Sequence, residues 1–161
     1  AVHDIDIFSY LLGKEPETIS SHSGSRLVSD RADYAEIFLN YGNQSGFIQV
    51  NWITPVKIRK LTITGSGGYA ELDYMKQTLN VYRSDVSRET DPSTGLENVV
   101  LKEAVEEAIP VKPAEPLFQE LNHAVQVITG QADSIISGEV GRNSLKTALQ
   151  AVHQMSQVAV N

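Results

Sequence analysis

Residues 34–52 read YAEIFLNYGNQSGFIQVNW, and two runs within them alternate between apolar and polar side chains. The apolar positions are Ala35, Ile37, Leu39 and Tyr41 in the first run and Ile48, Val50 and Trp52 in the second. A glycine-containing turn from Gly42 to Gly46 separates the runs. Alternation with a period of two around a short turn predicts a β-hairpin, with its apolar side, Trp52 included, facing the core.

Further strand signals flank this hairpin on both sides. The predicted strands are Thr18–Val28 at a sheet edge, Lys57–Thr64, Tyr69–Tyr74, Leu79–Tyr82 and Val99–Ile109. Residues 84–98 are rich in Ser, Asp, Thr, Pro and Gly, a composition that predicts a surface loop. Because the strands follow one another through short turns, we expect a mostly antiparallel sheet.

Three segments carry apolar residues at helical spacing. They are Asp4–Leu12, which ends at Gly13; Leu117–Ile128, which follows Pro116 and ends at Gly130; and a last helix that opens near Gly138 to Gly141 and reaches Met155. Three helices can cover only one face of such a sheet. We therefore predict an α+β fold for residues 1–161 as a single domain, an open, mostly antiparallel sheet of about six strands with helices packed on one face.

The face of the hairpin that points away from the core has a mixed composition. Its positions include Tyr34, Phe38 and Phe47 among Glu36, Asn40, Gln49 and Asn51. The mixture is too aromatic for a face in plain solvent and too polar for a core. We expect this open sheet face to form the subunit interface of a homo-oligomer, or else a ligand surface.

Composition excludes several classes of function. The 161 residues carry a net charge of −7 with scattered Lys and Arg, so a nucleic-acid partner is not expected. No run approaches the roughly 18 apolar residues of a membrane span, and the lack of cysteine fits a reducing compartment, so we expect a cytoplasmic protein. The spacings of His22, His123 and His153 match no ligand set, so no metal site is expected.

The cluster His3-Asp4-Ile5-Asp6 at the start of the first helix is the strongest candidate for a reactive site. An imidazole exchanges protons near neutral pH, which makes His3 a candidate general base. The alternative is structural, since acidic residues near a helix N-terminus are favoured by the helix dipole. A hydrolase that uses Asp4 and Asp6 together is not expected, because residues two apart on a helix point to different sides.

The segment Gly65-Ser66-Gly67-Gly68-Tyr69-Ala70 resembles the glycine-rich fingerprint of dinucleotide-binding folds. That fingerprint requires a following helix, whose N-terminus holds the pyrophosphate. Residues 69–74 alternate like a strand instead. We therefore read the glycines as a hairpin turn and expect no cofactor-binding residues in this chain.

Several motifs occur in a fixed order along the chain. They are His3-Asp4-Ile5-Asp6 before a helix ending in Leu12-Gly13, the strand pair leading to Trp52, Ile63-Thr64-Gly65-Ser66-Gly67-Gly68, Glu115-Pro116-Leu117 with Glu120-Leu121, and a final helix with Ser144, Leu145 and Met155-Ser156. In this order they resemble the C-terminal domain of the Gfo/Idh/MocA oxidoreductases, whose C-terminal domain is related in fold to that of glyceraldehyde-3-phosphate dehydrogenase.

The resemblance implies a role in sugar oxidation. In that family an N-terminal Rossmann domain binds NAD or NADP, and the C-terminal domain forms part of the sugar site and commonly the oligomer interface. By this resemblance His3 takes the proton from the hydroxyl that is oxidised, and Asp4 beside it contacts the substrate. The family's Asp four residues before this His, its Glu-Lys-Pro lysine and its cofactor loop have no counterpart here. We therefore expect a piece of a longer protein, without its Rossmann domain and inactive alone.

The run Trp52-x-x-Pro55-x-Lys57-x-Arg59 resembles dehydrogenases of nucleotide-linked amino sugars, such as UDP-N-acetylglucosamine 3-dehydrogenases. Two cations on one strand face would bind the diphosphate of such a substrate, or else pair with Glu36 or Asp73 on neighbouring strands. Trp52 would stack on a uracil or sugar if it lay outside the core. The alternative function is a stand-alone module that binds a sugar nucleotide or assembles subunits without chemistry.

Overall fold

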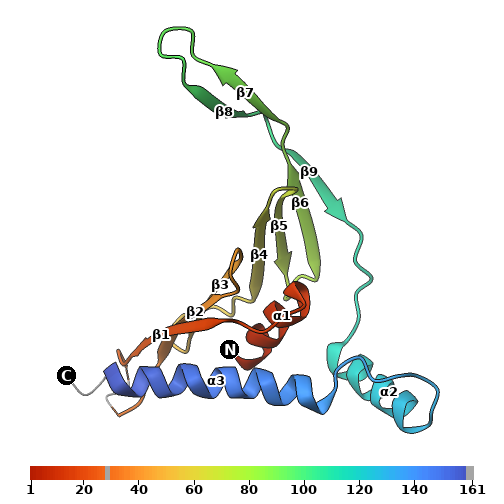
Figure 1. The fold of residues 1–161 in the computed structure, drawn as a ribbon. Helices are drawn as coiled ribbons and strands as arrows, with labels where there is room; N and C mark the ends of the chain where they lie inside the picture. Colours follow the sequence, from red (N-terminus) through yellow and green to blue (C-terminus); the bar gives the residue numbers. More distant parts are fainter. Residues whose placement is uncertain (28–29, 159–161) are drawn as a thin grey trace. The chain divides into compact units, whose positions relative to one another are not determined.

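The computed structural model describes residues 1–27 and 30–158 (Figure 1). Its elements are α1 (Val2–Leu12), β1 (Thr18–Gly24), β2 (Tyr34–Asn40), β3 (Ser45–Asn51), β4 (Lys60–Gly65), β5 (Gly68–Asp73), β6 (Thr78–Arg83), β7 (Val86–Thr90), β8 (Glu97–Leu101), β9 (Val105–Ile109), α2 (Pro116–Ile128) and α3 (Gly138–Val158). The chain divides into two compact units. The first unit is Ala1–Pro55 with His123–Asn161, and the second unit is Val56–Asn122.

The first unit is an antiparallel sheet in the order β1-β2-β3 with two helices against it. α3 lies along β1 and contacts α1, which also contacts β3 (Figure 1). The buried core joins all of these elements except β1 and consists of Ile5, Ile37, Leu39, Tyr41, Ile48 and Ala151. The core therefore lies on the face of the hairpin that the alternation in residues 34–52 predicts.

The position of α1 follows from a few contacts. Ile5 is fully buried, and a Cβ on Gly46 of β3 would lie only 2.9 Å from the ring of Phe8. The missing side chain at Gly46 thus lets α1 approach the sheet closely. The helix ends at Gly13, which adopts a left-handed conformation with φ 66° and donates its amide to the carbonyl of Ser9.

The second unit holds an antiparallel sheet in the order β4-β5-β6-β9 and a separate two-stranded sheet, β7-β8 (Figure 1). The register places Leu61, Leu72, Leu79 and Ile109 side by side on one face of the larger sheet. Lys60, Glu71, Asn80 and Tyr82 belong to the opposite face. The larger sheet thus has one apolar and one polar face.

The α+β class, the open antiparallel sheets and the three helices are confirmed. The described strands number nine in three sheets, more than the six or so of the prediction. Residues 84–98, predicted as a loop, contain β7 and the start of β8. The predicted strand Val99–Ile109 is two strands with different partners, since β8 pairs with β7 and β9 pairs with β6. Of the predicted edge strand, residues 18–24 form β1 at a sheet edge, and Val28 lies outside the described residues.

The prediction that Trp52 faces the core is wrong, because its side chain is 90% exposed. β3 ends at Asn51, whose side-chain oxygen accepts hydrogen bonds from the amides of Ile53 and Thr54. This turn takes the chain out of the sheet, so the alternation of Ile48 and Val50 does not extend to Trp52.

Among the described residues, no helix is long and apolar enough to span a membrane.

The β4–β5 turn yields a stability prediction. Gly68 has φ 128°, and a Cβ there would lie 2.2 Å from the backbone oxygen of Tyr82 on β6. Gly68→Ala is therefore expected to cost about 1–3 kcal/mol in the free energy of unfolding, measured by urea denaturation of the 161-residue chain.

The control is Gly67→Ala in the same turn, where a Cβ meets no atom within 4 Å among the described residues. This variant should have a urea midpoint of unfolding near that of the unsubstituted 161-residue chain. Equal midpoints for the two variants would show that the close approach of Gly68 to Tyr82 has no energetic consequence.

Candidate functional site

His3 lies in the first turn of α1, and its side chain is exposed. The helix forms here because Ile5 and Phe8 place apolar side chains toward the sheet while His3 falls on the outer side. Within the described residues of the first unit, no hydrogen bond or ion pair holds the imidazole. An exposed ring on a packed helix is accessible to a substrate hydroxyl, as a general base must be.

Asp4 is next to His3 and carries a partly exposed carboxylate. Its Oδ2 lies 3.2 Å from the amino nitrogen of Ala1. It is the acidic residue of the first turn of α1, a position that the helix dipole favours. The structure thus brings Asp4 and His3 together on one helix turn and is compatible with both the structural and the substrate-binding interpretation of Asp4.

Asp6 forms a side-chain contact with α3 that no pattern in the sequence indicates. The hydroxyl of Ser144 on α3 donates a hydrogen bond to Oδ1 of Asp6, with an O–O distance of 2.9 Å. Ser144 is 3% exposed, so this bond is screened from water. The contact joins the helix that carries His3 to the long helix α3.

Lys57 and Arg59 lie in the second unit and precede β4, so the prediction that they share a strand face is wrong. β4 begins only at Lys60, because its partner strand ends at Asp73, whose carboxylate turns the chain by accepting the amides of Met75 and Lys76. The carbonyl of Arg59 accepts a hydrogen bond from the amide of Tyr74, N–O 3.0 Å. Both side chains are exposed.

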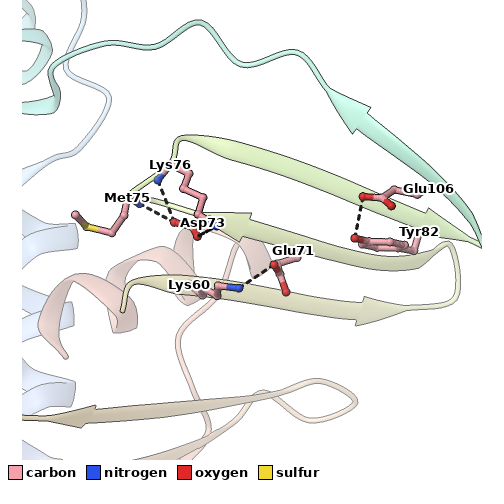
Figure 2. Close-up of polar contacts among 7 residues, drawn as sticks. All are labelled: Lys60, Glu71, Asp73, Met75, Lys76, Tyr82 and Glu106. Atoms are coloured by element: carbon pink, nitrogen blue, oxygen red, sulfur yellow. Dashed lines mark hydrogen bonds and ion pairs between the residues drawn. The ribbon is translucent and has the colours of Figure 1, made fainter. Parts of the chain in front are cut away.

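The polar face of the larger sheet forms ion pairs and hydrogen bonds within itself. Figure 2 shows the residues concerned, which are Lys60, Glu71, Asp73, Met75, Lys76, Tyr82 and Glu106. Lys60 Nζ lies 3.0 Å from Glu71 Oε1, and the Tyr82 hydroxyl donates to Glu106 Oε1 at 3.0 Å (Figure 2). Asp73 lies 3.9 Å from Lys76 Nζ, so the predicted pairing of Asp73 with Lys57 or Arg59 is not the one formed.

These contacts set the pKa values on this face. The hydrogen bond to Glu71 raises the pKa of Lys60, and the hydrogen bond to Glu106 raises the pKa of Tyr82. The backbone amide of Lys76 holds the pKa of Asp73 below its ordinary value, because hydrogen bonds stabilise the ionised carboxylate.

The charged groups of the polar face therefore already have partners. Within the second unit, all of whose residues the structure describes, neither Lys57 nor Arg59 has an ion pair. These two cations are consequently available for an anionic ligand.

The glycine-rich segment does not fit a dinucleotide. Gly65 and Gly68 pair across the β4–β5 turn, and β5 follows where a dinucleotide site would need a helix. Among the described residues no group of three or more His, Asp or Glu side chains is arranged to hold a metal ion. An open groove between residues 15–19 and α3 does not include His3 or Asp4.

Residues 1–71 match the family model of the GFO/IDH/MocA C-terminal domain. Two solved structures illustrate the fold. UDP-N-acetylglucosamine 3-dehydrogenase GnnA from Acidithiobacillus ferrooxidans has a TM-score of 0.78 at 21% identity over 96% of this chain and 45% of its own. An NAD-binding protein from Listeria innocua has a TM-score of 0.66 at 16% identity over 97% of this chain and 48% of its own. A search among curated proteins gives no match.

At these identities the solved structures show the fold, and the chain spans less than half the length of either protein. The segment matched in sequence contains all four predicted site residues, His3, Asp4, Lys57 and Arg59. The sequence match over residues 1–71 and the shared fold over 96% of the chain confirm its resemblance to the C-terminal domain of the Gfo/Idh/MocA oxidoreductases.

Proposed function

We propose that this chain is the substrate-binding and oligomerisation domain of a cytoplasmic NAD(P)-dependent oxidoreductase, here called the parent protein, that oxidises a hydroxyl group of a sugar or nucleotide sugar. The observation that carries the proposal is the exposed His3 on the first turn of α1, inside the segment that matches the family in sequence. The chain alone is expected to be inactive.

The chemistry assigned to this chain is proton removal. Oxidation of a secondary alcohol to a ketone releases one proton and one hydride. His3, in its neutral form, accepts the hydroxyl proton, as an imidazole can do near neutral pH. The hydride acceptor is a nicotinamide cofactor, NAD or NADP, held by another part of the parent protein, because the Gly65–Gly68 turn has no helix to bind it.

In the first unit, Asp4 beside His3 is proposed to bind hydroxyl groups of the substrate. In the second unit, Lys57 and Arg59 are proposed to bind an anionic group. Two exposed cations two residues apart suit a diphosphate, since ionised donors and acceptors form strong hydrogen bonds. A nucleotide sugar supplies such a group. The fold shared with a UDP-N-acetylglucosamine 3-dehydrogenase supports this class of substrate.

The sheet face opposite the helices is proposed as the subunit interface. Phe38 and Phe47 are cross-strand partners on this face, 48% and 57% exposed. An exposed aromatic pair beside the polar pair Glu36 and Gln49 has the mixed composition of a subunit interface.

The isolated 161-residue chain is expected to self-associate and to show no binding of NADH. Sedimentation velocity measures the first property and the fluorescence of titrated NADH the second. Tight NADH binding would overturn the assignment of the cofactor to another part of the parent protein. It would also contradict the alternative function, a stand-alone module without chemistry.

The double variant Phe38→Ser/Phe47→Ser should raise the dissociation constant of the oligomer by at least about tenfold, because aromatic side chains at an interface centre dominate its energy. Trp52→Ser is the control, as it removes an aromatic ring that is 90% exposed and lies beyond the end of β3. If only the control weakened association, the proposed interface would be wrong.

A further inference from the structure

The hydrogen bond between Ser144 and Asp6 joins two residues 138 positions apart in the sequence. Ser144 is 3% exposed and Asp6 is half-buried, so water competes weakly for either group. A hydroxyl that donates to a carboxylate under these conditions forms a directional link, stronger than a link between neutral groups. It fixes α1 against α3 at one defined point.

This point lies close to His3. Residues three apart on a helix are neighbours on its surface, so Asp6 and His3 share a side of α1. Helical side chains also lean toward the N-terminus, a tendency that favours a position of the Asp6 carboxylate over the turn that carries His3. The buried Ile5 holds the same turn against the sheet but leaves the rotation of the helix less defined, because apolar contacts are not directional.

We propose that Ser144 is a positioning residue for His3, acting through Asp6: its hydroxyl holds the first turns of α1 in the orientation from which the imidazole reaches the substrate hydroxyl. The inference rests on the proposed function of His3 as the base. Neither residue touches the substrate. The expected consequence is an effect on the chemical step, since a displacement of about 1 Å in a catalytic group can slow a reaction by about a hundredfold.

The test uses steady-state kinetics of the full-length parent protein. Ser144→Ala and Asp6→Ala should each lower kcat by about tenfold or more, with KM within about twofold of its original value. Asp6→Asn should keep most of kcat, because a side-chain carbonyl oxygen still accepts from Ser144. The double variant Ser144→Ala/Asp6→Ala should be no slower than either single variant, because both remove the same link.

Thr147→Ala is the matched control. Thr147 is on the same helix and is 6% exposed, and its substitution by Ala also removes a buried hydroxyl. Among the described residues, however, this hydroxyl forms no hydrogen bond to α1. Its kcat should stay within about twofold. A loss of kcat as large as that of Ser144→Ala would show that any loosening of α3 suffices, and would overturn the inference.

The variant His3→Ala distinguishes a failure of the positioning role of Ser144 from a failure of the proposed function of His3. If His3→Ala is inactive while Ser144→Ala and Asp6→Ala keep kcat, the positioning inference is wrong and the proposed function stands. If His3→Ala keeps most of the activity, the proposed function itself fails. If Ser144→Ala does not fold, the comparison of Asp6→Asn with Asp6→Ala decides, and equal kcat values for those two would contradict the inference.

Discussion

His3→Ala in the full-length parent protein is expected to lower kcat by about 10²- to 10⁴-fold, the usual contribution of a general base. KM should change little, because a general base acts in the chemical step and Asp4, proposed to bind the substrate beside it, remains in place. The exposed position of His3 on α1 predicts that its loss leaves the fold intact. Steady-state kinetics with a nucleotide sugar, together with the thermal unfolding midpoint, checks both expectations.

His22→Ala is a matched control, since this histidine is also exposed in the first unit but lies on β1. It should have almost the original kcat. A His3→Ala variant with most of its activity, or an equal loss in both variants, would remove His3 from the mechanism.

Leu39→Ala is expected to lower the free energy of unfolding by about 2–5 kcal/mol, as large-to-small changes in a core do. Leu39 is fully buried on β2 and belongs to the core cluster with Ile5 and Ile48. Urea denaturation of the 161-residue chain at fixed concentration measures the effect, because association shifts apparent stability.

Phe38→Ala supplies the comparison, since Phe38 is the neighbouring residue on β2 but is 48% exposed. Measured at a chain concentration low enough for the chain to be monomeric, so that any loss of the proposed interface does not contribute, it should cost about 1 kcal/mol or less, the value of a cross-strand pair at a surface. A larger loss of unfolding free energy in Phe38→Ala than in Leu39→Ala would show that the core has been assigned to the wrong face of the sheet.

The sequence predicted the first unit well because its signals are local. Alternation in residues 34–52 set the hairpin and its buried face, and Ile37, Leu39, Tyr41 and Ile48 are the buried residues that it predicts. The failure at Trp52 has a local cause too. Asn51 ends β3 by binding two later amides, and a hydropathy pattern does not register a side chain that turns the chain.

The β7–β8 hairpin was missed because the turn-forming residues at its centre led to the prediction of a loop for all of residues 84–98. Asp91 accepts a hydrogen bond from the amide of Ser93 at 2.7 Å, and Gly95 has φ 70°. These are the marks of a tight turn between strands. The flanking runs, Val86–Thr90 and Glu97–Leu101, are each only five residues long, so their β signal is weak beside the polar turn.

The candidate site was predictable only in part. His3 follows from the resemblance, because the residues alone leave its role as a base and a structural role open. The bond from Ser144 to Asp6 could not be predicted, since no periodic pattern pairs two helices 138 positions apart. Lys57 and Arg59 were placed on a strand that the prediction began three residues too early, because Asp73 ends the partner strand by capping a turn.

The coding sequence that precedes Ala1 tests most directly whether this chain is the C-terminal part of an NAD(P)-dependent oxidoreductase. The proposed function predicts an upstream glycine-rich strand-turn-helix segment, a Glu-Lys-Pro segment and an Asp four residues before His3, which together would encode the cofactor-binding half. A start codon immediately before Ala1 would contradict it. The chain would then be a binding or assembly module without chemistry, and His3 would have no substrate proton to accept.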